Sequence, residues 1–243
     1  MDLYPAIDLR GGRVVRLAQG DFGRETAYRD DPVAVAQEHE AAGAPWIHVV
    51  DLDAARGTGH NREVIASIAG AVRTPLQCGG GVRDDDAAEA LLGTGVRRVV
   101  IGTAAVEQPD LVGRLGARHP GRVAVGFDHR NGEVRVRGWA EGSGEQLLDL
   151  VAAAAVSHAA AVIVTDIGRD GMLVGPDLDG LAAVVRSTNL PVIASGGVGS
   201  LDDLRTLGGT GVAGVIVGRA LYEGAFTVED AVAALRSPEG GRV

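Results

Sequence analysis

The chain contains an internal repeat. Residues 80–104 match residues 196–220 without a gap, at a spacing of 116 positions, and 12 of the 25 aligned residues are identical. A second match, at a spacing of 120, aligns Asp8 with Asp128 and Gly12 with Gly132. Self-similarity at a fixed period constrains the architecture more than local propensity does. The sequence therefore predicts two similar halves, residues 1–120 and 121–236, related by an approximate two-fold axis.

Glycines that follow apolar runs make up much of this repeat. The pairs are Gly80 with Gly196, Gly81 with Gly197, and Gly102 with Gly218. A strand that ends in glycine and opens a helix exposes backbone N–H groups at the helix N-terminus, where an anion such as phosphate is favoured. The alternative is that these glycines only make tight turns. The pairing predicts one phosphate site in each half, and hence a ligand with two phosphates.

The order of apolar and helical segments indicates an α/β fold. Apolar runs of strand length recur at 3–7, 46–50, 75–78, 98–101, 123–127, 161–165, 191–194 and 213–217, with helical patterns at 32–42, 84–92, 144–155 and 178–185. Such an alternation predicts a parallel sheet covered on both faces. At 243 residues the chain is predicted to be a single domain, a (β/α)8 TIM barrel over 1–243 built from two (β/α)4 halves. A flavodoxin-like open sheet is the alternative.

Composition excludes several functions. All 23 basic residues are arginine. The absence of lysine excludes enzyme classes that need one, namely Schiff-base aldolases, pyridoxal-phosphate enzymes and P-loop nucleotide hydrolases. The formal charge of -9 argues against a nucleic-acid partner, and neither an export signal nor a membrane segment is recognised. Cys78 is the only cysteine, so an intrachain disulfide is excluded. We expect a cytoplasmic enzyme, because a reducing compartment fits this cysteine usage.

Aspartates at the predicted strand ends are candidate catalytic groups. In an eightfold barrel the active site lies at the carboxyl ends of the strands, where Asp8, Asp128 and Asp170 are expected. Two facing carboxylates can act as general base and general acid if their environments separate their pKa values. Loop capping is the alternative for any one of them. A divalent metal is a competing use, but no ligand spacing such as H-x-x-x-H supports it, so neither metal nor cofactor is expected.

Several longer motifs resemble one family. They are AIDLRGGRVVRLAQGDF from Ala6, HVVDLDAA from His48, CGGGVRDD from Cys78, GWAEGS from Gly138, TDIGRDGMLVGPD from Thr165 and ASGGVGSLDDL from Ala194. Over nearly the whole chain they are similar to phosphoribosylformimino-5-aminoimidazole carboxamide ribotide isomerase, the HisA family of histidine biosynthesis. The resemblance implies a cofactor-free barrel that opens an aminoaldose and converts it to an aminoketose by an Amadori rearrangement. The implied substrate carries a phosphate at each end.

The resemblance also implies roles for individual residues. Asp8 is expected to be the proton acceptor and Asp128 the proton donor, with Asp170 a further acid candidate. Thr165 would orient the substrate, and Trp139 is expected to act as a lid that stacks on the imidazole base. Substrate charge would be met by Arg16 and Arg83. The expected phosphate residues are Gly80, Gly81, Gly102 and Thr103 in one half, and Gly171, Gly196, Gly197, Gly218 and Arg219 in the other.

Two alternatives remain within this group of barrels. Arg137, in RGW, resembles bifunctional enzymes that also isomerise phosphoribosylanthranilate in tryptophan biosynthesis, where the arginine is thought to engage the anthranilate carboxylate. The run from Gly79 to Gly81 instead resembles the monofunctional enzymes. The cyclase subunit of imidazole glycerol phosphate synthase, a lyase that shares the doubled barrel, is less favoured, because its lysine-containing VVKG is VVRLAQGD here. A monomer is expected, since one chain already closes the barrel.

Overall fold

Eight parallel strands close into a barrel in the computed structural model, which describes residues 1–18, 20–154 and 158–236. Around the ring they are β1 (Asp2–Arg10), β4 (Ile47–Asp51), β5 (Leu76–Gly79), β6 (Arg98–Ile101), β7 (Val123–Arg130), β10 (Ala161–Asp166), β11 (Val192–Ser195) and β12 (Gly214–Val217). The pairing of β7 with β10 closes the circle. The predicted TIM barrel is therefore confirmed, and the open sheet is wrong.

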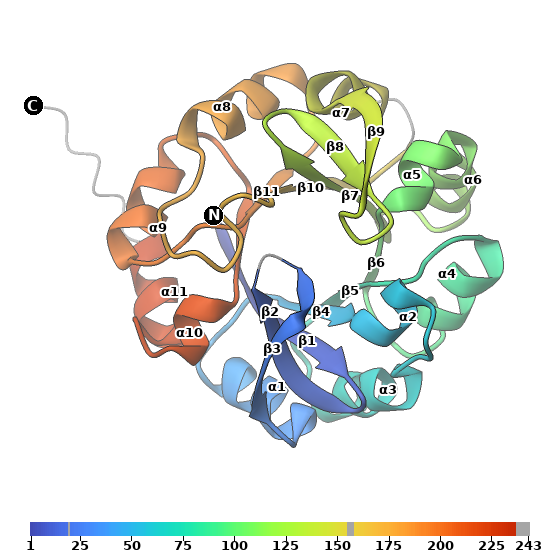
Figure 1. Ribbon diagram of the computed structural model, residues 1–243. Coiled ribbons are helices and arrows are strands. Elements are labelled where there is room, and N and C mark those ends of the chain that lie inside the picture. The colour runs from blue at the N-terminus through green and yellow to red at the C-terminus, as the bar shows by residue number, and fades with distance from the viewer. Residues whose placement is uncertain (19, 155–157, 237–243) are drawn as a thin grey trace, which may run out of the picture.

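Helices surround the strands (Figure 1). They are α1 (Pro32–Ala41), α2 (Leu52–Arg56), α3 (Arg62–Ala71), α4 (Asp85–Leu92), α5 (Thr103–Glu107), α6 (Pro109–Arg118), α7 (Leu147–Ala154), α8 (Leu178–Ser187), α9 (Leu201–Gly208), α10 (Arg219–Tyr222) and α11 (Val228–Arg236). Side chains cap several starts: Asp84 accepts from the N–H of Ala87, and Ser200 forms a capping box with Asp203. The apolar faces of the helices pack on the outward-facing side chains of the strands, and this layer forms most of the buried core.

Two hairpins that the sequence reasoning missed extend the first strand of each half. The strands β2 (Arg13–Ala18) and β3 (Asp21–Arg29) follow β1, whereas β8 (Glu133–Val136) and β9 (Glu141–Gln146) follow β7. Figure 1 shows the two hairpins on opposite sides of the ring. Their registers correspond, because Asp8 pairs with Val15 and Asp128 pairs with Arg135, 120 positions later in each case.

The second hairpin corrects one helix boundary. The helix expected over 144–155 begins at Leu147, because residues 144–146 belong to β9. Strand β9 is mostly exposed and reads EGSGEQ, so it lacks the apolar alternation by which a half-buried strand is recognised. Residue 155, at the other end of the expected helix, lies outside the described residues.

The barrel interior is filled differently in the two halves. Aliphatic and small side chains occupy the second half, including Ala124, Ile163 and Ile193. Larger and more polar side chains, Tyr4 and Arg98 among them, fill the first half. The halves complement each other: a Cβ on Gly214 would lie 2.5 Å from Cε2 of Tyr4, so the missing side chain on β12 makes room for the phenol ring of β1.

This complementarity predicts the effect of filling the space. Gly214→Ala should lower the free energy of unfolding by about 1–3 kcal/mol, because the added methyl group overpacks the interior against Tyr4. Gly70→Ala in α3 is the matched control: its Cβ meets nothing within 4 Å, and it should raise stability by about 0.4–1 kcal/mol. Urea unfolding of both variants measures the difference. Equal stability of the two variants would contradict the packing described here.

Candidate active site

Asp8 and Asp128 face each other across the carboxyl end of the barrel. Strands β1 and β7 are separated by three strands on either side of the ring, so they lie opposite each other. Asp8 lies two positions after the inward-facing Ala6 of β1, and Asp128 four positions after Ala124 of β7. The side-chain period of a strand therefore points both carboxyl groups inward. The internal repeat has placed one buried carboxyl group on each side of the mouth.

Arg16 forms an ion pair with Asp8. Its Nη1 lies 2.9 Å from Oδ2 of Asp8, and both side chains are largely buried. Burial raises the pKa of Asp8, and the Arg16 guanidinium acts in the opposite direction. The β1–β2 turn that carries Arg16 back over Asp8 is itself tied down, since the N–H of Gly11 donates to Asp53 and that of Gly12 donates to Asn61. The hairpin thus delivers the cation to the carboxyl group.

Trp139 holds Asp128 on the opposite side. Its Nε1–H donates to Oδ2 of Asp128 at 2.7 Å. Burial raises the pKa of Asp128, while hydrogen bonds from Trp139 and Thr165 lower it to a smaller extent. Trp139 has a φ of +71°, a conformation that non-glycine residues seldom adopt. Its ring packs on Gly20, where a Cβ would lie 2.4 Å from Cε3, so the two hairpins meet over the mouth.

Asp170 is the third carboxyl group of the mouth. It follows β10, and its N–H donates to the carbonyl oxygen of Asp166. Burial raises its pKa to about 6, with Arg16 lowering it and the charges of Asp8 and Asp128 raising it. The charges of Asp8 and Asp128 thus both act on Asp170, which lies with them at the mouth. Perturbed carboxyl groups in a cleft are typical of catalytic sites.

The second-half phosphate residues line one cleft. Its walls come from strand β2, from the loop after β10, and from the ends of β11 and β12 with the residues that follow them. They are Arg16, Asp170, Gly171, Leu173, Ser195, Gly196, Gly197, Val198, Ile216, Val217, Gly218 and Arg219. Five predicted residues, Gly171, Gly196, Gly197, Gly218 and Arg219, are thus brought together. Gly218 has a clear reason to lack a side chain, because its Cβ would lie 2.2 Å from Nη2 of Arg16. Arg219 donates to the carbonyl oxygen of Gly171 at 2.6 Å.

Ser195 and Leu173 line the cleft without a predicted role in binding. Ser195 was expected at the mouth as a polar residue at a strand end, and it ends β11 at the position that corresponds to Gly79 in the first half. Leu173 takes a φ of +57°, for which the sequence carries no signal.

The first-half glycines lie at matching positions. Gly102 precedes α5 with φ and ψ of −95° and −106°, close to the −115° and −90° of Gly218 before α10. Gly80 and Gly81 pass so near the backbone of Asp51 and Ala54 that a Cβ would lie 2.2 and 2.6 Å from their carbonyl oxygens. These two glycines therefore also serve the close packing of their loop, as the tight-turn alternative proposes. Whether they bind phosphate stays a prediction.

Two predicted arginines have protein partners instead of facing the mouth unpaired. Arg83 donates to the carbonyl oxygens of Ala54 and Ala55, so its side chain caps the end of α2. Arg137 pairs with Glu107 and Glu141, each at 3.1 Å, and its N–H donates to Oγ1 of Thr103. The side chain of Arg137 is 59% exposed. Their roles in substrate binding remain predictions, now with competing structural roles.

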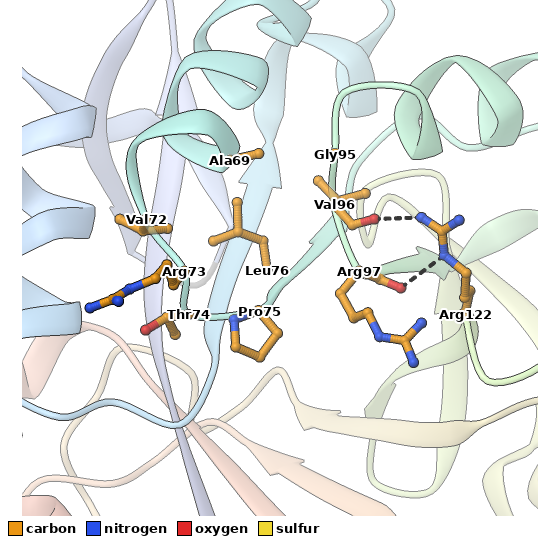
Figure 2. A pocket seen from close by; sticks show the side chains of 10 residues that line it. All are labelled: Ala69, Val72, Arg73, Thr74, Pro75, Leu76, Gly95, Val96, Arg97 and Arg122. Atoms are coloured by element: carbon orange, nitrogen blue, oxygen red, sulfur yellow. Dashed lines mark hydrogen bonds between the residues drawn. The ribbon is translucent and has the colours of Figure 1, made fainter.

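A larger cavity lies at the opposite end of the barrel, away from the aspartates. It has a volume of about 330 Å³ and is lined by residues that precede β5, β6 and β7. Figure 2 shows the guanidinium groups of Arg73, Arg97 and Arg122 pointing in different directions, with Arg122 donating to the carbonyl oxygens of Val96 and Arg97. The cavity therefore presents no convergent polar groups, and the carboxyl end is the better site.

Within residues 1–18, 20–154 and 158–236, no group of three or more His, Cys, Asp and Glu side chains is arranged to hold a metal ion. No helix within them is long and apolar enough to cross a membrane.

Comparison with known proteins places the chain among close relatives. The model of a family described as "Histidine biosynthesis protein" matches residues 2–227. A protein of Synechococcus elongatus is 50% identical over 241 residues, which cover 98% of this chain and 94% of the relative. Relatives from Thermobifida fusca (48% identity, 97% of each chain) and Nocardioides sp. (49%, 100% of this chain and 98% of the relative) are equally full-length matches. All three are named 1-(5-phosphoribosyl)-5-((5-phosphoribosylamino)methylideneamino)imidazole-4-carboxamide isomerase.

The raised pKa of Asp170 predicts a pH-dependent cost to stability. Because the folded-state pKa of about 6 exceeds the ordinary 3.8, the folded state binds more protons between these values, and stability falls as pH rises through them. Asp170→Asn removes the buried charge. It should raise the free energy of unfolding by about 1–3 kcal/mol at pH 8 and by much less at pH 4. Chemical denaturation at both pH values measures the gain, and an equal effect at both would contradict this assignment.

Proposed function

The chain belongs to the histidine biosynthesis protein family, and we propose that it is the isomerase that converts an aminoaldose, phosphoribosylformimino-5-aminoimidazole carboxamide ribotide, to the aminoketose. One observation carries the proposal: two carboxyl groups with different neighbours, the buried Asp8 and the partly buried Asp128, face each other across the mouth of the barrel. Family membership identifies the reaction, and the two carboxyl groups supply what the reaction needs.

The rearrangement requires one acid and one base. The acid protonates the ribose ring oxygen as the bond from C1 to that oxygen breaks, which leaves an open-chain iminium group. The base then removes the proton from C2, which gives an enolamine. The enolamine takes up a proton at C1 and loses the proton of its C2 hydroxyl group, which gives the aminoketose. No atom or electron is gained or lost overall, so the step needs no redox partner. General acid and base groups typically contribute about 10²- to 10⁴-fold each.

The surroundings of the two aspartates support one division of labour. Burial raises the pKa of both carboxyl groups. Asp8 has the Arg16 guanidinium beside it, whose charge opposes this shift and favours the carboxylate form that a base needs. Asp128, which is partly buried, has the hydrogen-bond donors of Trp139 and Thr165 in place of that cation, and its raised pKa favours retention of the proton that an acid needs. Asp170 interacts electrostatically with both and is the further acid candidate.

We also propose that the two ends of the substrate bind to the two halves of the barrel. The cleft formed by Gly196, Gly197 and Gly218 would take one phosphate, and Gly80, Gly81, Gly102 and Thr103 would take the other. The corresponding backbone conformations of Gly102 and Gly218 support the pairing. Arg16 borders the first of these clefts and could contact the phosphate or the sugar.

The setting of the enzyme is part of the same proposal. A small-molecule substrate, a monomeric chain and a cytoplasmic location fit a closed barrel with a single buried cysteine and a negative net charge. Nucleic acid is an unsuitable partner for a chain of charge -9.

The geometry does not favour activity on phosphoribosylanthranilate over the main reaction. The arginine that would bind its carboxylate, Arg137, is already paired with two glutamates. An incoming anthranilate carboxylate would compete with Glu107 and Glu141 for this guanidinium. We therefore propose the histidine-pathway reaction as the main activity.

Removing the base should nearly abolish turnover. Asp8→Asn is expected to lower kcat by about 10²- to 10⁴-fold, because the amide cannot accept the C2 proton. Asp2→Asn, at the exposed start of the same strand, is the matched control and should leave kcat unchanged. The measurement is steady-state isomerisation by purified protein without added metal or cofactor, with circular dichroism to check the fold.

Two outcomes of this assay would overturn parts of the proposal. Retention of more than a few per cent of activity by Asp8→Asn would remove Asp8 from the role of base. Absence of turnover by the wild-type protein would remove the proposed activity itself. The same assay with phosphoribosylanthranilate tests the bifunctional alternative: turnover of both substrates would favour it, and absence of turnover of phosphoribosylanthranilate would reject it.

A further inference from the structure

Three buried polar side chains form a chain of hydrogen bonds beneath the catalytic aspartates. Arg98 donates from Nε and Nη2 to Oε1 of Gln77, at 3.1 and 2.6 Å. Nε2 of Gln77 lies 3.0 Å from Nδ1 of His48. Gln77 is fully buried, and Arg98 and His48 are less than 10% exposed. Neighbouring groups surround Arg98, with Tyr4 OH 3.2 Å from Nη2 and the Trp46 ring 4.5 Å from Cζ.

The order of donors fixes the proton on His48. A guanidinium group has only N–H donors, so it must face the amide oxygen of Gln77. The amide NH2 group then faces His48 and has protons to give, so Nδ1 of the imidazole must accept. A neutral imidazole that accepts at Nδ1 carries its proton at Nε2. The hydrogen-bond chain therefore selects one of the two tautomers.

The surroundings also keep this imidazole neutral. Burial, together with the charges of Arg16 and Arg98, lowers the pKa of His48 to about 3. Arg16 comes from β2 at the mouth, and Arg98 from β6 in the interior. His48 is in register with Ala6, two residues before Asp8 on the neighbouring strand. His48 is thus the end of the hydrogen-bond chain that lies beside the strand carrying Asp8.

The second half of the barrel shows that the fold does not need these polar groups. At the repeat spacing of 116, Ile193 corresponds to Gln77 and Gly214 corresponds to Arg98. Ile163 corresponds to His48, because it pairs with Gly126 as His48 pairs with Ala6. Buried polar and charged groups cost free energy that aliphatic side chains avoid. Their presence in one half only indicates a role other than support of the fold.

We propose that Gln77 and Arg98 are positioning residues that hold His48 in one neutral tautomer, with Nε2–H as a fixed donor beside the Asp8–Arg16 pair. The catalytic part of this proposal rests on the proposed function. A neutral imidazole adds no second cation near Asp8, so the basicity of Asp8 is preserved. A fixed Nε2–H also spares the site the reorganisation that a mobile donor would need.

The tautomer is tested on the wild-type protein, independently of any substrate. Imidazole 15N shifts distinguish the protonated nitrogen, and His48→Gln identifies the His48 signals among the six histidines. We expect a proton on Nε2 and no titration of His48 between pH 5 and 8. A proton on Nδ1, or titration near the ordinary pKa, would overturn the proposal.

The positioning role is tested with Gln77→Glu. Its carboxylate still accepts from Arg98, but it has no proton to give, so His48 should carry its proton on Nδ1. We expect kcat to fall on the order of 10-fold, as for partners that orient the residues of a site, with KM less affected. Ile193→Val, at the corresponding position of the other half, is the control and should change neither the 15N shifts nor kcat. A relocated proton with an unchanged kcat would contradict the positioning role.

A second pair of variants covers failure of Gln77→Glu to fold. The terminal amide of Gln at position 48 can supply an N–H close to that of Nε2, whereas Leu cannot. His48→Gln should therefore retain at least several-fold more kcat than His48→Leu, and equal rates would count against the proposal. If the wild-type protein does not isomerise the aminoaldose at all, the proposed function fails while the tautomer measurement still stands or falls by itself.

Discussion

The ion pair between Arg16 and Asp8 is the interaction on which the site depends. It brings a buried carboxyl group, the proposed base, and its counter-charge together at the mouth, and it requires the hairpin β2–β3 to fold back over β1. The same guanidinium lies against Gly218 and lowers the pKa of Asp170. One side chain therefore links the base, the third carboxyl group and the second-half cleft. Without its charge, burial would act unopposed on Asp8 and the base would hold its proton.

The doubled architecture explains both the symmetry and the asymmetry of the site. Repetition places a carboxyl group, a hairpin and a glycine-rich loop on each side of the barrel. The two copies have then acquired different neighbours: Arg16 beside Asp8, and Trp139 beside Asp128. An acid and a base must differ in proton affinity, so a symmetric pair could not divide the work. The interior has diverged in the same way: the polar Gln77 of the first half corresponds to the aliphatic Ile193 of the second half.

The sequence predicted the barrel well because its strands carry a strong signal. The apolar runs match the eight parallel strands to within a few residues at each end, as the segment at 98–101 shows for β6. The position of Asp170 and the second-half glycines also followed from strand ends and the repeat. The hairpins did not, since strands such as β9 are exposed and rich in glycine. Nor could pattern show that Arg83 caps α2 or that Arg137 pairs with two glutamates, because those contacts join segments far apart in the sequence.

The central claim is that an ionised Asp8 and a protonated Asp128 act together in one mouth. The pH dependence of kcat/KM for the wild-type enzyme and for Asp128→Asn tests it most directly. The account predicts a bell-shaped profile for the wild type, with the acid side set by the base and the alkaline side by the acid. The alkaline side should disappear in Asp128→Asn, together with most of the rate. A wild-type profile that does not change with pH, or an unaltered alkaline side in the variant, would contradict the account.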